Sequence, residues 1–323
     1  MAMQYEQLRE LWELDLEHKL IITRGRIREW YEYWNGQVYV SFSGGKDSTV
    51  LLHIVREMYP DVPAVFVDTG LEYPEVRDFA LSTPNVIRLT PELTFKQVIE
   101  QYGYPIISKR QAGILHELRE QDLSARYRNY LLNGDERGDK GTLSKKWHYL
   151  INAPFKISAY CCDVMKKRPI YRYERALKTK PFIGVMAQEG KARAENYIKY
   201  GCNAYEVEKP QSRPLGFWLE SDIWQYIRED NVDYSSIYDM GCDRTGCMFC
   251  MFGCHLEPEV NRFQRMQITH PKQYQYCIGG GQWKDGMWGP SKTGLGLGFV
   301  LDYIGVPYDD RNNLWSTEEL LEM

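Results

Sequence analysis

Six consecutive residues near the start of the chain have the composition of a phosphate-binding loop. They follow an apolar stretch with the pattern of a β-strand, residues 37–42, and precede one with the pattern of a helix, residues 48–55. Two adjacent glycines let backbone N–H groups approach an anion, and the amino end of the helix directs its positive dipole to the same point. The lysine adds a cation, the serines add hydroxyl donors, and the aspartate can cap the helix or hold a metal ion. The six residues are Ser43, Gly44, Gly45, Lys46, Asp47 and Ser48.

This loop lacks the Gly-x-x-x-x-Gly-Lys-Ser/Thr spacing of the common nucleotide-hydrolysing motors. Its glycines, lysine and hydroxyls still fit a nucleotide polyphosphate. The loop therefore predicts a phosphate site, but not an enzyme of the γ-phosphate-cleaving class.

A second group of chemically active residues consists of cysteines. The chain has eight cysteines, and we expect them to bind metal or to react, because the cytosol keeps thiols reduced. Two close pairs supply the four thiolates that a [4Fe-4S] cluster requires, if folding brings them together. The pairs are Cys161 with Cys162, and Cys247 with Cys250.

Two further cysteines leave the ligand set open. Cys242 and Cys254 flank the second pair, so a zinc site within residues 242–254 is an alternative. Either flanking cysteine could also replace a member of the first pair as a cluster ligand. Cys202 and Cys277 stand alone and are interpreted as ordinary thiols.

The bulk composition is that of a globular protein. Apolar residues make up 43% and charged residues 26% of the chain. No apolar run approaches the ~20 residues of a membrane helix, and the first residues lack the pattern of a secretory signal. We therefore expect a cytoplasmic protein that does not enter the membrane. The net charge of -4 argues against coating of nucleic acid by the whole surface.

The elements around the loop alternate between strand and helix patterns, which predicts an α/β fold with a Rossmann-like parallel sheet flanked by helices. Strand patterns cover residues 37–42, 62–67, 84–89 and 180–187; helical patterns cover residues 4–34, 48–55, 95–102, 106–135 and 220–228. We expect three parts: a helical brace (1–36), a nucleotide-binding domain (37–235) and a Cys/Gly-rich C-terminal region facing cluster and substrate (236–323). Its glycine clusters, at 279–281 and 294–298, predict little regular structure there.

In its strand-to-helix setting, the loop resembles the pyrophosphate loop of the N-type ATP pyrophosphatases and their relatives, the phosphoadenosine-phosphosulfate reductase family. The resemblance implies a sheet of the adenine nucleotide α-hydrolase type that binds ATP with Mg²⁺ and cleaves it to AMP and pyrophosphate. Residues 68–75 resemble the family segment beside the adenosine, which implies nucleotide contacts at Asp68, Thr69 and Gly70. Residues 184–193 resemble a later family stretch, except at Met186 and Gly190, and imply an anion ligand at Arg193.

Residues 161–169 resemble the tandem-cysteine segment of the iron-sulfur sulfonucleotide reductases, including its lysine at Lys166. The nearest likeness is to the ATP pyrophosphatase subunit of bacterial DNA phosphorothioation, which also combines this loop with a cluster. These resemblances imply catalytic roles for Lys46, Asp47, Lys166 and Arg193 in adenylation and sulfur transfer. They also imply a nucleic-acid acceptor, DNA or tRNA, and a sulfur donor such as a cysteine desulfurase.

Two other functions stay open. One is reduction of adenylyl sulfate or phosphoadenylyl sulfate by a cysteine thiolate. Those reductases carry a carboxy-terminal Glu-Cys-Gly-Leu-His motif, which residues 317–323 do not match. The other is a nucleotide-binding subunit with a structural zinc site and no turnover.

Overall fold

The computed structural model describes residues 4–136, 138–258 and 260–309 of the chain. The chain divides into two compact units, each made of segments that are separated in the sequence. The first comprises Met1–Asp68, Glu72–Thr90 and Pro169–Thr245; the second comprises Thr69–Leu71, Pro91–Arg168 and Gly246–Met323. The boundary expected at residue 235 falls inside the first unit. Residues 317–323, with the unmatched tail motif, lie outside the described residues.

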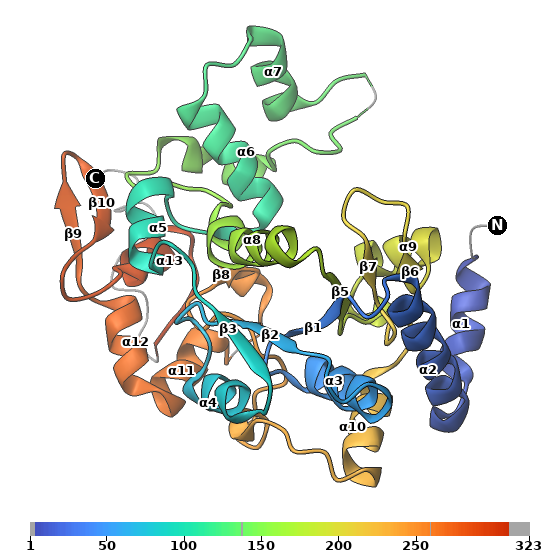
Figure 1. Cartoon of the computed structure of the whole chain (residues 1–323). Helices are drawn as coiled ribbons and strands as arrows, with labels where there is room; N and C mark the ends of the chain where they lie inside the picture. The colour runs from blue at the N-terminus through green and yellow to red at the C-terminus, as the bar shows by residue number, and fades with distance from the viewer. Residues whose placement is uncertain (1–3, 137, 259, 310–323) are drawn as a thin grey trace. The chain divides into compact units, whose positions relative to one another are not determined.

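A six-stranded sheet forms the centre of the first unit (Figure 1). Its strand order is β3-β2-β1-β5-β7-β6, and its paired strands are parallel except for β6 with β7. Val40 on the central strand β1 pairs with Ala64 on one side and Phe182 on the other. The expected parallel sheet is confirmed. Its strands are β1 (Val38–Phe42), β2 (Ala64–Val67), β3 (Val86–Leu89), β5 (Lys180–Ile183), β6 (Asn203–Ala204) and β7 (Gln211–Ser212).

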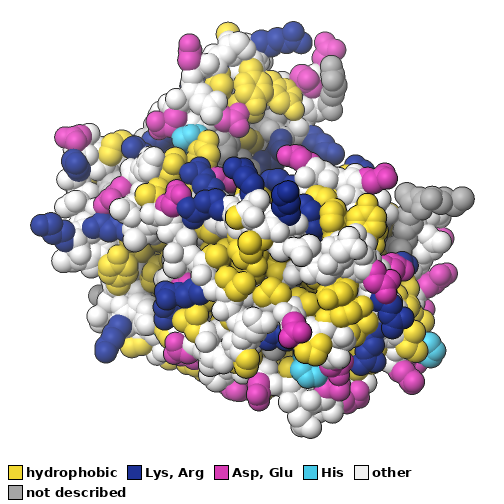
Figure 2. Space-filling model, viewed as in Figure 1, with side chains coloured by type: hydrophobic (Ala, Val, Ile, Leu, Met, Phe, Trp, Pro, Cys, Tyr) yellow, Lys and Arg dark blue, Asp and Glu magenta, His cyan; other side chains and the backbone are white. Residues whose placement is uncertain are grey.

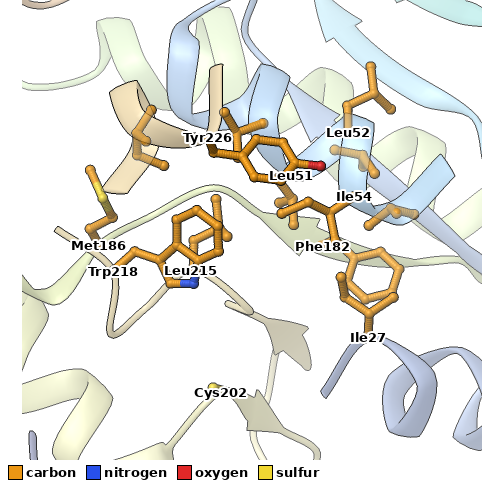
Figure 3. Close-up of a cluster of buried hydrophobic side chains, with 14 of the residues drawn as sticks. Ile27, Leu51, Leu52, Ile54, Phe182, Met186, Cys202, Leu215, Trp218 and Tyr226 are labelled. Atoms are coloured by element: carbon orange, nitrogen blue, oxygen red, sulfur yellow. The ribbon is translucent and has the colours of Figure 1, made fainter. Parts of the chain in front are cut away.

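Helices cover this sheet and bury its apolar side chains. They are α1 (Tyr5–Glu13), α2 (Leu16–Tyr33), α3 (Lys46–Met58), α4 (Pro74–Ser82), α8 (Arg168–Leu177, whose first residue ends a segment of the second unit), α9 (Lys191–Tyr200) and α10 (Glu220–Glu229), with short turns η3 (Ala187–Glu189) and η4 (Ser236–Tyr238). Figure 3 shows part of the core, where α3 packs with side chains of α2, β5 and α10; labelled members include Ile27, Leu51, Leu52, Ile54, Phe182 and Tyr226. Burying α3 in this way fixes the helix that follows the loop.

A buried ion pair joins α2 to α10. The Lys19 side chain is 1% exposed, and its Nζ lies 2.6 Å from Asp222 Oδ2. Lys19 Nζ also donates to the Trp12 carbonyl oxygen at 2.9 Å. Asp222 accepts the Leu219 N–H at 2.7 Å and thereby caps α10. Each of the two buried charges is thus paired with the other and has a further hydrogen bond to the backbone.

We expect Lys19→Met to lower the free energy of unfolding by ~3–5 kcal/mol, because it leaves the Asp222 carboxylate buried without its counter-ion. The control is Arg24→Met on the same helix, which removes a half-exposed pair with Glu57 and is expected to cost less than ~1 kcal/mol. Urea unfolding followed by tryptophan fluorescence measures both values. Equal, small losses in the two variants would contradict the prediction.

The second unit is mainly helical (Figure 1). Its helices are α5 (Phe95–Tyr102), α6 (Lys109–Glu120), α7 (Ala125–Asn133), α11 (Arg262–Thr269), α12 (Pro271–Ile278) and α13 (Leu297–Tyr303), with short turns η1 (Lys145–Asn152), η2 (Asp163–Lys167) and η5 (Cys254–Leu256). Strand β4 (Ile106–Ile107) pairs in parallel with β8 (Met251–Phe252), and β9 (Gly281–Lys284) forms a hairpin with β10 (Met287–Pro290). Across both units, none of the helices in the described parts of the chain has the length and apolarity needed to cross a membrane.

The expectation of little regular structure around the glycine clusters is wrong only in part, since Gly279, Gly280, Gly294 and Gly296 do lie outside helices and strands. Gly281 begins β9, and Gly298 lies within α13. These glycines instead permit close packing: a Cβ atom on Gly280 would overlap the backbone of Gly294, and one on Gly281 would overlap the Trp288 ring. Glycine marks close approach as well as loops.

Candidate nucleotide and cluster sites

The predicted phosphate loop lies where β1 ends and α3 begins. Gly44 has φ +73°, in the left-handed region that favours glycine, and a Cβ atom there would lie 2.7 Å from the Val76 carbonyl oxygen. The Ser43 N–H donates to Ser48 Oγ at 3.1 Å, and the Ser48 hydroxyl donates to the Gly45 carbonyl at 2.9 Å. These bonds hold a tight bend at the amino end of the helix.

Hydroxyl groups of the first unit already accept hydrogen bonds from two loop amides. The Gly45 N–H donates to Ser43 Oγ at 3.3 Å. The Lys46 N–H donates to the Tyr238 hydroxyl at 2.8 Å, and Thr245 Oγ1 lies 3.3 Å from that hydroxyl. The Tyr238 hydroxyl therefore accepts a hydrogen bond from a loop amide that, by the sequence prediction, donates to a phosphate oxygen.

The Lys46 ammonium is buried between two carboxylates. Its side chain is 5% exposed, and Nζ lies 3.4 Å from Asp47 Oδ1 and 3.0 Å from Glu220 Oε1. The rings of Trp224 and Tyr238 also face it, with centroids at 6.0 and 5.6 Å. Burial lowers the pKa of Lys46, but Asp47 and Glu220 outweigh this effect and raise the pKa above its ordinary value. The lysine thus keeps its charge.

A pocket of about 350 Å³ opens beside this lysine. Arg193, the predicted anion ligand, lines it and forms an ion pair with Glu189. Burial, followed by the charge of Arg244, lowers the pKa of Arg193. The structure thus brings Lys46, Asp47 and Arg193 to one pocket.

Asp68 has a different setting at the end of β2. Its carboxylate is buried, and Oδ2 lies 2.8 Å from Arg77 Nη2 and 2.7 Å from Arg88 Nη2. These ion pairs tie β2 to α4 and β3. Thr69 and Gly70 belong to the second unit, where Thr69 Oγ1 accepts the Leu71 N–H at 3.2 Å. Nucleotide contacts at Asp68, Thr69 and Gly70 stay predictions.

In the second unit, the two cysteine pairs come close enough to influence each other. Cys161 Sγ lies 3.9 Å from Cys162 Sγ, immediately before the π-helical turn η2, a feature frequent at functional sites. The hydrogen bond with Cys162, burial, and the charges of Cys250 and Cys247 all raise the pKa of Cys161. The Cys161 hydrogen bond lowers the pKa of Cys162 despite burial, aided by two ammonium groups, those of Lys109 and Lys166. Lys166 thus lies near the cysteines, as predicted.

A single metal ion and an iron-sulfur cluster need different spacings of their cysteine ligands. No three His, Cys, Asp or Glu side chains in the described ranges are placed to hold one metal ion. Zinc needs its sulfur ligands ~2.3 Å from one centre, whereas the four thiolates of a [4Fe-4S] cluster bind different iron atoms and stand farther apart. Cys161, Cys162, Cys247 and Cys250 supply the number of thiolates that such a cluster needs.

The other cysteines have settings of their own. Cys254 is buried, and its thiol donates to the Met251 carbonyl at 3.0 Å. Cys242 belongs to the first unit, whereas Cys254 belongs to the second. Cys202 lies 3.1 Å from the Tyr197 hydroxyl, and Cys277 is fully buried. These settings are consistent with a ligand set of Cys161, Cys162, Cys247 and Cys250, which stays a prediction.

A parallel sheet with a glycine loop between its central strand and a buried helix defines an α/β protein of the nucleotide-binding class. The chain matches the family model of the phosphoadenosine phosphosulfate reductase domain over residues 37–117 and 123–252, which is more than half its length. It belongs to this family, whose members are enzymes that use nucleotides. The loop and both cysteine pairs lie within the matched residues.

Individual relatives are distant. An uncharacterized protein of Methanocaldococcus jannaschii is 24% identical over 82% of this chain and 48% of its own length, so the chain spans about half of that relative. Adenosine 5'-phosphosulfate reductase 1 of Bacillus subtilis is 26% identical over 68% of this chain and 76% of its own length. The crystal structure of phosphoadenylyl-sulfate reductase from Candida auris, at 16% identity, covers 76% of this chain and 97% of that chain with a TM-score of 0.41.

The sequence did not single out four residues of the pocket: Glu220, Tyr238, Arg244 and Thr245. Glu220 begins α10, whose buried Ile223, Tyr226 and Ile227 give it the pattern of a core helix, and an acidic residue in a first helical turn is common. Tyr238 is 192 residues from Lys46, and no local pattern connects positions so far apart.

Proposed function

We propose that the chain cleaves ATP at its α-phosphate and uses the adenylated product for sulfur transfer. A substrate oxygen bonds to the α-phosphorus and pyrophosphate leaves; a sulfur nucleophile then displaces AMP. The pocket of the first unit is the main support, because it joins a buried ammonium, the amino end of the 13-residue helix α3 and an arginine in one place. No covalent bond to the protein is needed at the phosphorus.

Each residue of the loop has a role in this proposal. The amides of the glycine bend and the hydroxyls of Ser43 and Ser48 bind the polyphosphate. Lys46 and Arg193 stabilise the charge that develops on the departing pyrophosphate. In this role the Lys46 ammonium moves from the Glu220 carboxylate toward phosphate oxygens.

Asp47 is suited to hold Mg²⁺. Its Oδ1 atom is buried and, among the residues that the structure describes, has no hydrogen-bond partner beyond the ion pair with Lys46. Magnesium is usually bound by one or two carboxylates together with substrate phosphates, so a single carboxylate at the loop is sufficient. When bound, the ion neutralises phosphate charge.

The [4Fe-4S] cluster would be held by Cys161, Cys162, Cys247 and Cys250. When bound, such a cluster supplies redox-active iron close to thiolate sulfur. Lys166 and Lys109, which stabilise the Cys162 thiolate, would offset the negative charge of the cluster.

We propose a nucleic acid, DNA or tRNA, as acceptor, and a donor such as a cysteine desulfurase as the source of sulfur. Figure 2 shows Lys and Arg side chains gathered around the position of α8 in Figure 1. Arg172 and Arg175 of α8, and Lys178 directly after it, are exposed. A local basic group of this kind suits phosphate backbones despite the net charge of -4.

The test is the fate of ATP labelled at the α-phosphate. We expect labelled AMP and pyrophosphate, with release stimulated by DNA or tRNA. Formation of ADP and phosphate would contradict the proposal, and binding without turnover under every condition would indicate a nucleotide-binding subunit.

Reduction of adenylyl sulfate is a second candidate, favoured by the 26% identity to the Bacillus subtilis reductase over 76% of that protein. In that reaction a cysteine thiolate bonds to the sulfur and AMP leaves; a second thiol then reduces the adduct and releases sulfite. Production of sulfite from adenylyl sulfate and thioredoxin, without pyrophosphate release from ATP, would decide for this candidate.

We expect Tyr238→Phe to tighten the binding of ATP about 2- to 12-fold, measured by calorimetry. The variant removes the hydroxyl that accepts the Lys46 N–H, and a hydrogen bond of this kind contributes ~0.5–1.5 kcal/mol. Tyr234→Phe is the control, because its hydroxyl donates to Asp239 instead. Weaker binding in Tyr238→Phe would show that the hydroxyl contacts the nucleotide rather than competing with it.

A further inference from the structure

We propose that Arg244 is a further polyphosphate-binding residue, which presents a second guanidinium to the pocket beside Arg193. This inference rests on the proposed function, because it concerns the same site. It adds a ligand that neither the loop nor the family resemblance pointed to.

Lys46 and Arg193 each form ion pairs in the pocket, whereas Arg244 is available to bind an anion. Arg193 pairs with Glu189, and Lys46 pairs with Asp47 and Glu220. No ion pair to Arg244 occurs within the described part of the chain. Its guanidinium is exposed at the pocket, so it can bind an incoming anion without first breaking an ion pair.

The balance of charge in the pocket gives Arg244 its importance. The lining holds three carboxylates, Asp47, Glu189 and Glu220, and three cations, Lys46, Arg193 and Arg244. Without Arg244 the carboxylates would outnumber the cations. The pocket lining would then carry a net negative charge, which repels a polyphosphate. The guanidinium also provides a planar fork that binds phosphate oxygens in pairs.

Two cationic side chains approach each other in this pocket. The charge of Arg244 lowers the pKa of Arg193, in addition to the effect of burial. Like charges repel, so this arrangement costs free energy in the unliganded protein. An anion bound by both guanidiniums would relieve the repulsion.

The residues around Arg244 hold it at the phosphate loop. Thr245, the next residue, approaches so closely that a Cβ atom on Gly45 would lie 2.5 Å from its Oγ1. Tyr238, in the same stretch of residues 238–245, turns its ring toward the Lys46 ammonium, with 5.6 Å between the ring centroid and Nζ, a contact that does not need the hydroxyl. The segment is therefore fixed at both ends against the loop, which keeps Arg244 within reach of a bound polyphosphate.

The experiment measures binding of magnesium pyrophosphate by calorimetry to the whole chain. We expect Arg244→Gln to weaken binding about 10- to 100-fold, because a charged hydrogen-bond donor is lost. Arg244→Lys should restore part of the loss, since lysine keeps the charge but not the fork. Arg228→Gln, an exposed arginine at the end of α10 and outside the pocket, should bind as the wild type does. Thermal unfolding should be the same in all four proteins.

The outcomes separate this inference from the proposed function. Wild-type affinity in Arg244→Gln, together with loss of binding in Lys46→Met, would overturn the role of Arg244 and leave the loop site standing. Failure of the wild type to bind pyrophosphate would overturn both.

Discussion

Replacing Lys46 with methionine is expected to lower kcat/KM for pyrophosphate release from ATP by ~100-fold or more. Methionine is unbranched and only one atom shorter than lysine, so it fills most of the same space beside the Trp224 and Tyr238 rings, but it carries no charge. A preorganised cation that stabilises the leaving group acts mainly in the transition state, so kcat should fall more than KM rises.

The structure also indicates what Lys46→Met does to the protein without nucleotide. Burial raises the pKa of Asp47, and the Lys46 charge opposes this effect. Without the lysine, the pKa of Asp47 rises further and the carboxylate takes up a proton more readily. Glu220 is half exposed and stays hydrated. We therefore expect the fold to persist, which thermal unfolding checks.

The controls for this prediction separate charge from position. Lys199→Met removes an exposed lysine of α9 and should leave turnover unchanged. Lys46→Arg keeps the charge but enlarges a buried side chain, so intermediate activity is expected. Wild-type turnover in Lys46→Met would exclude the proposed nucleotide site.

The second large effect is expected at the cysteines: Cys247→Ser and Cys250→Ser should each lose the visible absorbance and the iron and sulfide of anaerobically prepared protein. Each variant removes one of the four thiolates on which a [4Fe-4S] cluster depends. Iron content should fall from about four atoms per chain to nearly none. Chemical analysis of iron, sulfide and zinc measures the outcome.

Matched cysteine variants test the ligand set. Cys202→Ser should keep the iron, because a serine hydroxyl can replace the thiol beside the Tyr197 hydroxyl. Cys254→Ser should also keep it, since serine can donate to the Met251 carbonyl as the thiol does. Loss of iron in Cys254→Ser with retention in Cys162→Ser would show that Cys254 is a ligand. Stoichiometric zinc without iron in the wild type would reject the cluster.

The sequence was sufficient for those parts of the fold that depend on local patterns. Alternating strand and helix patterns predicted the strands β1, β2, β3 and β5, and the apolar period predicted the helix Phe95–Tyr102 with the bounds that the structure has. The two glycines of the loop were informative because a strand pattern precedes them and a helix pattern follows them. The glycines at 279–281 were misleading at Gly281, which begins β9. Close packing against Trp288 requires glycine there, and in the sequence this requirement cannot be told from that of a loop.

Only the tertiary structure decided which charges and hydroxyls surround the loop. It joined Lys46 to Glu220, gave the Lys46 amide to Tyr238, and committed Asp68 to Arg77 and Arg88. It also brought the two cysteine pairs close enough for the charges of Cys247 and Cys250 to raise the pKa of Cys161. Such contacts join positions far apart in the chain. They leave no helical or strand periodicity in the sequence, so residue types and spacing do not predict them.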